Sequence, residues 1–159
     1  MSPTPSNTPL IIQATLEHLD LVAPLFNDYR IFYKKASDLT AARAYLQARL
    51  EQTESVVYLA VRERDQGREA LGFTQLYPLF SSLSLKRTWV LYDLFVAPEA
   101  RRQGVAEALL ERAKKLGQES GAAEISLDTA IDNLSAQALY EKFGFVRDEE
   151  FYTYYLTIS

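Results

Sequence analysis

The chain contains no cysteine and only one histidine, and both shortages exclude whole classes of chemistry. Without cysteine there is no disulfide framework, no thiolate metal site and no cysteine nucleophile. A site of several histidines is excluded by count, and we expect no metal cofactor. The one histidine, His18, would have to serve any Ser-His-Asp triad. Because it lies at the start of a helical pattern, we interpret it as a solvated histidine in a first turn.

The sequence also lacks a basic surplus and a long apolar run. Its net charge is −4, and nucleic-acid binding without sequence preference needs a basic face, so we expect no nucleic-acid partner. A mildly acidic chain suits a cationic substrate somewhat better than an anionic one. No apolar run approaches the roughly 20 residues of a membrane span. Residues 1–9 lack the basic region and the apolar region of a signal peptide and are expected to form a flexible lead-in. We therefore expect a cytoplasmic protein with no membrane partner.

The length of 159 residues fits one domain, which we place at residues 10–159. Apolar spacing predicts strands at 10–14, 56–61, 70–80, 87–96, 125–129 and 151–158, and helices starting near 15, 38, 104 and 134. Consecutive strands in the middle indicate antiparallel hairpins, whereas the later alternation of strands and helices indicates crossovers. The predicted fold is α/β (α+β), with one mixed sheet and helices on both faces.

The segment after the strand at 87–96 has the features of an anion site. Its sequence is Arg101-Arg102-Gln103-Gly104-Val105-Ala106, and it stands where a helix start leaves N–H groups unpaired and carries positive dipole charge. Gly104 lacks a Cβ, so an anion can approach the backbone closely. The pattern indicates a diphosphate cradle, and a solvated turn before an amphipathic helix fits the spacing as well. Neither the Walker phosphate loop nor the dinucleotide fingerprint matches it.

One charged residue, Asp93, lies inside the apolar run from Trp89 to Val96. A carboxylate there is costly unless it is paired or near solvent, and such residues often have perturbed pKa values and transfer protons. Two interpretations stay open at this point. Asp93 serves catalysis or the binding of a substrate amine, or it forms a structural ion pair with Lys86 or Arg87.

Two motifs resemble those of the GNAT superfamily of N-acetyltransferases. Arg101-x-x-Gly104-x-Ala106, which follows Leu94-Phe95-Val96-Ala97-Pro98, is similar to its motif A, and the segment 133–145 is similar to its motif B. The order of elements also fits, so the resemblance covers nearly the whole chain. It is nearest to the polyamine/diamine and small histone-acetyltransferase-like members. The resemblance implies a mostly antiparallel sheet of six to seven strands, flanked by four helices and splayed between the fourth and fifth strands.

The resemblance also implies acetyl-CoA as the acyl donor and gives roles to individual positions. Backbone N–H groups of residues 102–107 would hold its pyrophosphate, and the strand edge at 94–96 would pair with its pantetheine arm. The implied cofactor-binding residues are Leu94, Phe95, Val96, Arg101, Arg102, Gln103, Gly104, Val105, Ala106, Glu107, Asn133, Ala136 and Tyr140. The amide of Leu94 would donate to the thioester carbonyl, and the hydroxyl of Tyr140 would protonate the departing thiolate. Spacing by itself favours a core position for Tyr140.

The sequence departs from spermidine/spermine-type acetyltransferases, which have an acidic pair where this chain has Tyr92-Asp93. The base is Asp93 acting through water, or it is no side chain at all. The candidate substrate-binding residues are Phe32, Tyr33, Tyr77, Phe80, Tyr92 and Asp93. Such an aromatic and mildly acidic cleft would suit an aliphatic amine or a lysine-like side chain.

These features predict acetyl transfer to a primary amine, such as a polyamine or an amino acid, by direct attack and without an acyl-enzyme. One alternative is a histone-like protein acetyltransferase that modifies lysine side chains. Another is a sensor that binds acyl-CoA without turnover. Family members are often dimers, so we expect a homodimer, with the tyrosine-rich segment 151–158 as a plausible partner surface.

Overall fold

A computed structural model of the chain describes residues 8–159. These form two compact units, one that ends at Leu127 and one that spans Asp128–Ser159. Most of the lead-in expected at residues 1–9 lies outside the described residues. None of the described helices is long and apolar enough to cross a membrane.

The first unit contains one five-stranded sheet in which the strands follow sequence order. The strands are β1 (Leu10–Gln13), β2 (Val56–Arg64), β3 (Gly67–Ser81), β4 (Lys86–Val96) and β5 (Ile125–Ser126). The first four pair antiparallel, and β5 joins β4 in parallel. Short polar turns separate the central apolar runs, and this produces the predicted hairpins.

The predicted number of six to seven strands is wrong, because the sheet of the described residues has five. The strand expected at 125–129 ends at Ser126. The segment 151–158 forms no strand, and its aromatic side chains are largely exposed. Alternating aromatic residues favour a strand only where a neighbouring strand and a covered face are available, and this segment has neither in the described structure.

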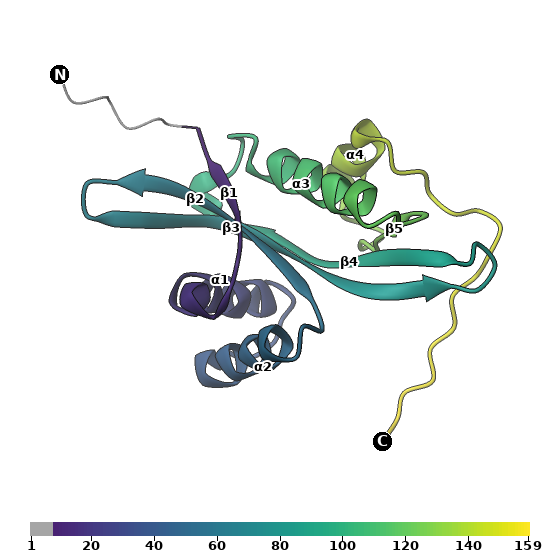
Figure 1. The fold of residues 1–159 in the computed structure, drawn as a ribbon, viewed down its shortest axis with the longest axis horizontal. Helices are drawn as coiled ribbons and strands as arrows, with labels where there is room; N and C mark the ends of the chain where they lie inside the picture. Colours follow the sequence, from purple (N-terminus) through teal and green to yellow (C-terminus); the bar gives the residue numbers. More distant parts are fainter. Residues whose placement is uncertain (1–7) are drawn as a thin grey trace. The chain divides into compact units, whose positions relative to one another are not determined.

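Helices α1 (Leu19–Phe32) and α3 (Val105–Glu119) lie on opposite faces of this sheet, and α2 (Leu39–Glu51) packs beside α1 (Figure 1). Local capping explains where these helices begin. The carboxylate of Asp38 accepts a hydrogen bond from the N–H of Ala41 at 3.0 Å, which caps α2. A one-turn 3-10 helix, η1 (Leu16–His18), precedes α1. In it Nδ1 of His18 accepts from the N–H of Thr15 at 2.9 Å, so the only histidine caps a helix start.

A bulge interrupts the pairing of β3 and β4 and sets the direction of two side chains. Gln75 pairs with Asp93, but the next residue Leu76 pairs with Leu91, so Tyr92 is the extra residue. Bulges re-aim side chains within a strand. Here the side chain of Tyr92 is 68% exposed and that of Asp93 is 4% exposed. The bulge thus places the one acidic residue of β4 inside the unit.

The strand β5 pairs only with Trp89 and Val90 of β4. Beyond Val90, no strand of the described sheet continues along that side of β4. The pairing of the fourth and fifth strands therefore ends after two residues, at the place where the splay is predicted. This leaves the second half of β4 with a free edge in the sheet.

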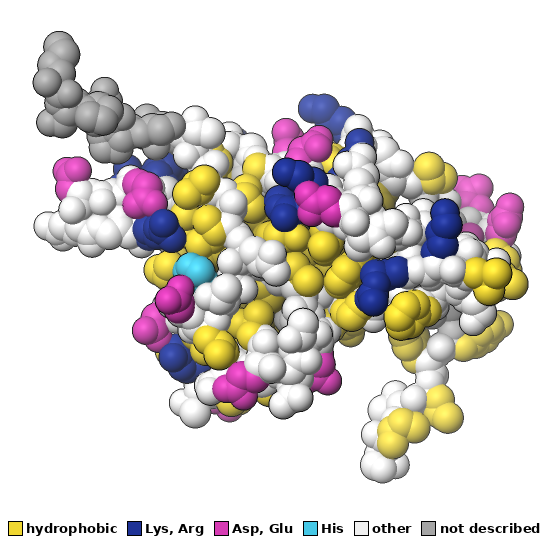
Figure 2. Space-filling view, in the orientation of Figure 1, with side chains coloured by type: hydrophobic (Ala, Val, Ile, Leu, Met, Phe, Trp, Pro, Cys, Tyr) yellow, Lys and Arg dark blue, Asp and Glu magenta, His cyan; other side chains and the backbone are white. Residues whose placement is uncertain are grey.

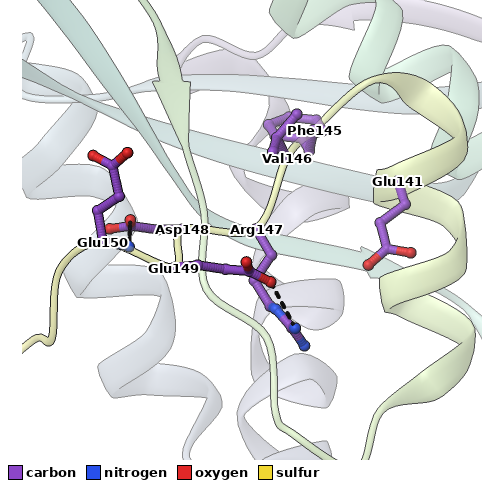
Figure 3. Close-up of a pocket in the computed structure, with 7 residues that line it drawn as sticks. All are labelled: Glu141, Phe145, Val146, Arg147, Asp148, Glu149 and Glu150. Carbon is purple, nitrogen blue, oxygen red and sulfur yellow. Dashed lines mark hydrogen bonds and ion pairs between the residues drawn. The ribbon is translucent and has the colours of Figure 1, made fainter.

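The second unit contains α4 (Leu134–Phe143), which is capped at both ends. The side chain of Asn133 accepts a hydrogen bond from the N–H of Ala136 at 3.2 Å. Gly144, at a φ of 123°, ends the helix. A hollow follows, lined by Glu141 and by residues 145–150, and Figure 3 shows its four carboxylates and Arg147. Arg147 pairs with Glu149 at 3.1 Å, and all four carboxylate side chains are exposed to solvent, so we assign no site to this hollow.

Charged side chains of both signs are interspersed on the face shown in Figure 2, where no broad basic patch stands out. The net charge of −4 is consistent with this distribution.

Candidate active site

A tyrosine-lined hollow of about 450 Å³ lies among α1, α2, β3 and β4 of the first unit. Its lining residues are Phe26, Tyr29, Arg30, Tyr33, Lys35, Ala41, Ala42, Tyr45, Tyr77, Tyr92 and Asp93. Tyr29 lies on α1 and Tyr33, four residues further on, is the C-cap of this helix, so the two side chains share a face, and their ring centroids are 5.0 Å apart. The ring of Phe26 stacks on that of Tyr45 at 5.8 Å. The hollow thus has aromatic walls with several phenolic hydroxyls.

Asp93 is the only carboxylate among the residues that line this hollow. Nε2 of Gln75 donates to Oδ2 of Asp93 at 2.8 Å, and Oγ of Ser55 donates to Oε1 of Gln75 at 2.8 Å. All three residues are buried. Because Ser55 engages the amide oxygen of Gln75, the NH₂ group of Gln75 is directed at the carboxylate. The buried chain Ser55–Gln75–Asp93 therefore fixes the orientation of the acid.

The structural ion pair between Asp93 and Lys86 or Arg87, one of the two interpretations of the sequence, does not form. Among the described residues neither Lys86 nor Arg87 pairs with it. Arg87 lies instead over the rings of Phe80 and Trp89, at 4.8 and 5.4 Å from their centroids. A neutral donor, Gln75, takes the place of a cation, so the charge of Asp93 is not neutralised by a basic partner.

Burial is the main cause of the perturbed acidity of this carboxyl. It raises the pKa of Asp93 above its ordinary value, and hydrogen bonds from Gln75 and Tyr29 partly oppose the rise. Such a carboxyl binds a proton more readily than an exposed aspartate does. Perturbed carboxyls of this kind in a cleft are candidates for acid–base chemistry.

Two tyrosines of the hollow keep their protons over a wide pH range. Burial raises the pKa of Tyr29, and the nearby charge of Asp93 raises it further. The single hydroxyl proton of Tyr29 is shared with the backbone oxygen of Tyr92, which lies 3.3 Å from the hydroxyl oxygen. Burial raises the pKa of Tyr77, as does its hydrogen bond to Tyr45, with 2.6 Å between the two hydroxyl oxygens. The hollow therefore offers neutral hydroxyl donors beside the carboxylate.

The free edge of β4 starts directly beside Asp93. The N–H of Ala97 donates to the carbonyl of Leu71 in β3 at 2.8 Å. Because successive backbone groups of a strand point to alternate edges, those of Leu94 and Val96 point to the edge away from β3. The carbonyl of Val96 accepts from Nε of Arg101 at 3.2 Å on that side. Leu94 thus presents its N–H at an edge where the described sheet has no partner strand.

The loop before α3 has the backbone geometry of an anion site. Arg102 and Gly104 have φ values of 63° and 78°, both in the left-handed region. Gly104 is the N-cap of α3, and no side chain caps this helix start. Arg101 and Arg102 are exposed beside it. Uncapped first-turn N–H groups with two adjacent arginines suit a bound phosphate group.

Gln103 stabilises this loop from within. Its Nε2 donates to the carbonyl of Glu99 at 3.2 Å, and its Oε1 accepts a hydrogen bond from Arg62 of β2. Val105 is buried beneath the helix start, whereas Ala106 is partly exposed and Glu107 is exposed. The loop is therefore tied to the sheet while its outer face stays open.

The remaining residues implied for the cofactor belong to the second unit. Oδ1 of Asn133 caps α4, which leaves its Nδ2 as the group available to a ligand. Tyr140 is half-buried, and its ring contacts that of Phe145 with 5.8 Å between centroids. The roles of Asn133, Ala136 and Tyr140 toward the cofactor stay predictions.

Four of the six candidate substrate residues, Tyr33, Tyr77, Tyr92 and Asp93, line the hollow, whereas Phe32 and Phe80 do not. Phe32 contacts Phe95 at 6.4 Å between centroids. Phe80 is 71% exposed. Sequence reasoning missed Tyr29, Tyr45 and Gln75. The spacing of Tyr29 and Tyr33 on one helix was a usable signal, but no local pattern marked Gln75 or Ser55.

Comparison with known proteins identifies the class of protein that this fold defines. The chain belongs to the acetyltransferase (GNAT) family, whose sequence profile matches residues 22–145. An uncharacterised N-acetyltransferase of Bacillus subtilis (strain 168), YhfO, is 46% identical over 148 residues, which are 93% of this chain and 97% of that protein.

Solved structures agree with this assignment. The crystal structure of a probable acetyltransferase, 53% identical in sequence, has a TM-score of 0.88 and covers 94% of this chain and 98% of its own. AAC(6')-Iy, solved with the bisubstrate analogue CoA-S-monomethyl-acetylneamine, shares the fold, with a TM-score of 0.77 at 23% identity and coverage of 96% and 100%. The chain is therefore an acetyl-CoA-dependent N-acetyltransferase that transfers an acetyl group to an amine.

Proposed function

We propose that the acceptor is a small primary amine that enters the tyrosine-lined hollow and meets Asp93. The observation that carries this proposal is the adjacency of two groups on β4. The side chain of Asp93 lines the hollow, and the backbone of the next residue, Leu94, faces the free strand edge. A proton acceptor and a hydrogen-bond donor for the acyl group thus occupy consecutive positions.

The cofactor side of the proposal uses the free edge and the loop before α3. Leu94, Phe95 and Val96 flank the pantetheine arm of acetyl-CoA. The first-turn N–H groups from Arg102 to Glu107, with Arg101 beside them, hold its pyrophosphate. In the second unit, the residues that we assign to the cofactor are Asn133, Ala136 and Tyr140. The left-handed backbone at Arg102 and Gly104 supports this assignment, because left-handed residues are typical of the backbone turns whose N–H groups bind anions.

A residue of the hollow then removes a proton from the ammonium group of the acceptor. An alkyl ammonium group has a pKa of about 10.4 and carries no free lone pair at neutral pH. Asp93 accepts that proton, directly or through a water molecule, and its raised pKa makes it a better acceptor than an exposed carboxylate. The neutral hydroxyls of Tyr29 and Tyr77 orient the amine.

Two further groups act on the acyl donor. The N–H of Leu94 donates to the acyl oxygen as negative charge develops there. The hydroxyl of Tyr140 donates a proton to the departing thiolate, whose conjugate acid has a pKa of about 8.5 by analogy with cysteine. Attack by the amine is direct, and no acyl-enzyme forms. As the C–S bond breaks, the attacked nitrogen loses its second proton, which passes through water to Tyr140 and restores the hydroxyl, and Asp93 releases its proton to solvent.

The test is thiol release from acetyl-CoA with a panel of polyamines, amino acids and basic peptides. We expect turnover with at least one small amine, and a loss of about 10²- to 10⁴-fold in kcat/KM for Asp93→Asn. Asp28→Asn is the matched control, because Asp28 is exposed on α1 and does not line the hollow. Tight binding of CoA without turnover of any amine would support an acyl-CoA sensor instead. Turnover of the peptides alone would support a protein acetyltransferase.

A further inference from the structure

Two basic side chains, Arg30 and Lys35, line the same hollow as Asp93. Arg30 lies in the last turn of α1, and Lys35 lies in the connection to α2. The N–H of Lys35 donates to the carbonyl of Arg30 at 2.9 Å. This bond closes the turn after α1, so the backbone that carries both cations is held in place.

Neither cation is neutralised by the protein. Within residues 8–159, no ion pair includes Arg30 or Lys35. The arginines of the neighbouring helix α2 behave differently, because Arg43 pairs with Asp20 and Arg49 pairs with Glu54. Both cations of the hollow are therefore available to an anionic group of a ligand.

The charges of the hollow disfavour a polycation. Its lining contains two cations and one carboxylate, and the carboxylate is the most deeply buried of the three. A polyamine would place its second ammonium group near Arg30 and Lys35, and like charges repel most where water is partly excluded. An amine with an anionic group at its other end would meet opposite charges at both ends.

We propose that the acceptor carries an anionic group, in the simplest case a carboxylate, in addition to its primary amine. This inference rests on the proposed function and names the substrate class of the same site. The amine lies at Asp93, the apolar body of the acceptor packs against the aromatic walls, and the anion lies at Arg30 and Lys35. The volume of about 450 Å³ falls within the range of roughly 300–1,000 Å³ that is usual for small-molecule pockets.

Matched pairs of amines test this inference. 4-(Aminomethyl)benzoate and benzylamine differ only in a carboxylate, as do 6-aminohexanoate and pentylamine, and spermidine represents a polycation. We expect kcat/KM for the carboxylated member to be about 10- to 100-fold higher in at least one pair, since charge-assisted hydrogen bonds have this strength. A preference for the plain amine in both pairs, or for spermidine over all of them, would overturn the inference.

Substitutions show whether the two cations cause the preference. In the double variant Arg30→Gln/Lys35→Gln we expect a higher KM for the carboxylated amine, so that the ratio of kcat/KM for the carboxylated amine to kcat/KM for the plain amine falls by about 10- to 100-fold. Lys34→Gln is the control, because Lys34 is exposed and adjacent but does not line the hollow. Thermal unfolding verifies that all variants fold. A preference that survives the double variant would contradict the role of these cations.

Calorimetric binding to the enzyme loaded with CoA separates this inference from the proposed function. If no amine is acetylated but the carboxylated member still binds more tightly through Arg30 and Lys35, the inference stands and the catalytic proposal fails. If amines are acetylated but the plain member is preferred, the catalytic proposal stands and the inference fails. If neither member binds or reacts, both fail.

Discussion

Nε2 of Gln75 lies 2.8 Å from Oδ2 of Asp93, and both side chains are buried in the sheet. This hydrogen bond crosses from β3 to β4 at the bulge formed by Tyr92. It orients a carboxylate that no cation neutralises among the described residues. The same bond favours the ionised form of Asp93, against the effect of burial.

Replacing Gln75 with leucine tests this positioning role. The change removes the donor and leaves a buried carboxylate without that partner, so the pKa of Asp93 should rise further. We expect the acidic limb of the pH profile of kcat/KM to move to higher pH, and the free energy of unfolding to fall by about 1–3 kcal/mol. Ser55→Ala, which keeps the donor of Gln75, should cause a smaller shift. A reduced rate with an unmoved limb would assign Gln75 a purely structural role.

Asp93→Asn should change activity and stability in opposite directions. Burial raises the pKa of Asp93 from its ordinary value of 3.8, so the folded state binds a proton at this carboxyl more tightly than the unfolded state does. The stability that the folded state gains from this tighter proton binding is fully present below about pH 3.8. It is lost as the pH rises through the folded-state pKa of Asp93. The variant should therefore be more stable than the wild type at neutral pH, while its kcat/KM is lower. Denaturant unfolding at several pH values measures this, and equal stability at every pH would contradict it.

Gly104→Ala tests the anion site, with Gly121→Ala as a matched control. Both glycines have positive φ values, 78° and 66°, and an added Cβ would have no atom within 4 Å at either position. Each substitution should cost about 1–2 kcal/mol of stability through backbone strain. Only Gly104→Ala should also raise the KM for acetyl-CoA, because a methyl group there obstructs the approach of an anion. Equal KM values for the two variants would argue against this site.

Tyr140→Phe tests the proposed proton donor of the second unit. The change removes one hydroxyl and keeps the ring that contacts Phe145, and thermal unfolding verifies that the variant folds. Loss of a general acid should lower kcat by about 10²- to 10⁴-fold and leave the affinity for CoA unchanged. Single-turnover kinetics and CoA titration measure both quantities. Wild-type turnover in this variant would exclude Tyr140 as the acid.

Local sequence signals predicted most elements of the fold. Asp38 and Asn133 each cap a helix with their own side chain, and a cap depends only on residues within one turn. The central hairpins followed from apolar runs separated by short polar turns. The prediction failed at 151–158, where an alternating aromatic pattern was interpreted as a strand. A strand requires a neighbour and a covered face, and neither is encoded within the segment.

In the candidate site, too, some features follow from local sequence and others from the tertiary structure. The sequence alone determined the helix start that we propose as an anion site, at residues 101–107, because contiguous residues form that helix start and its first-turn N–H groups. It also singled out Asp93 as an unusual charge in an apolar run. Only the tertiary structure decided what surrounds that charge. Gln75 lies 18 residues from Asp93, and Ser55 lies 20 residues before Gln75. Strand pairing and a one-residue bulge bring these side chains together, since register depends on the whole sheet and not on any local pattern.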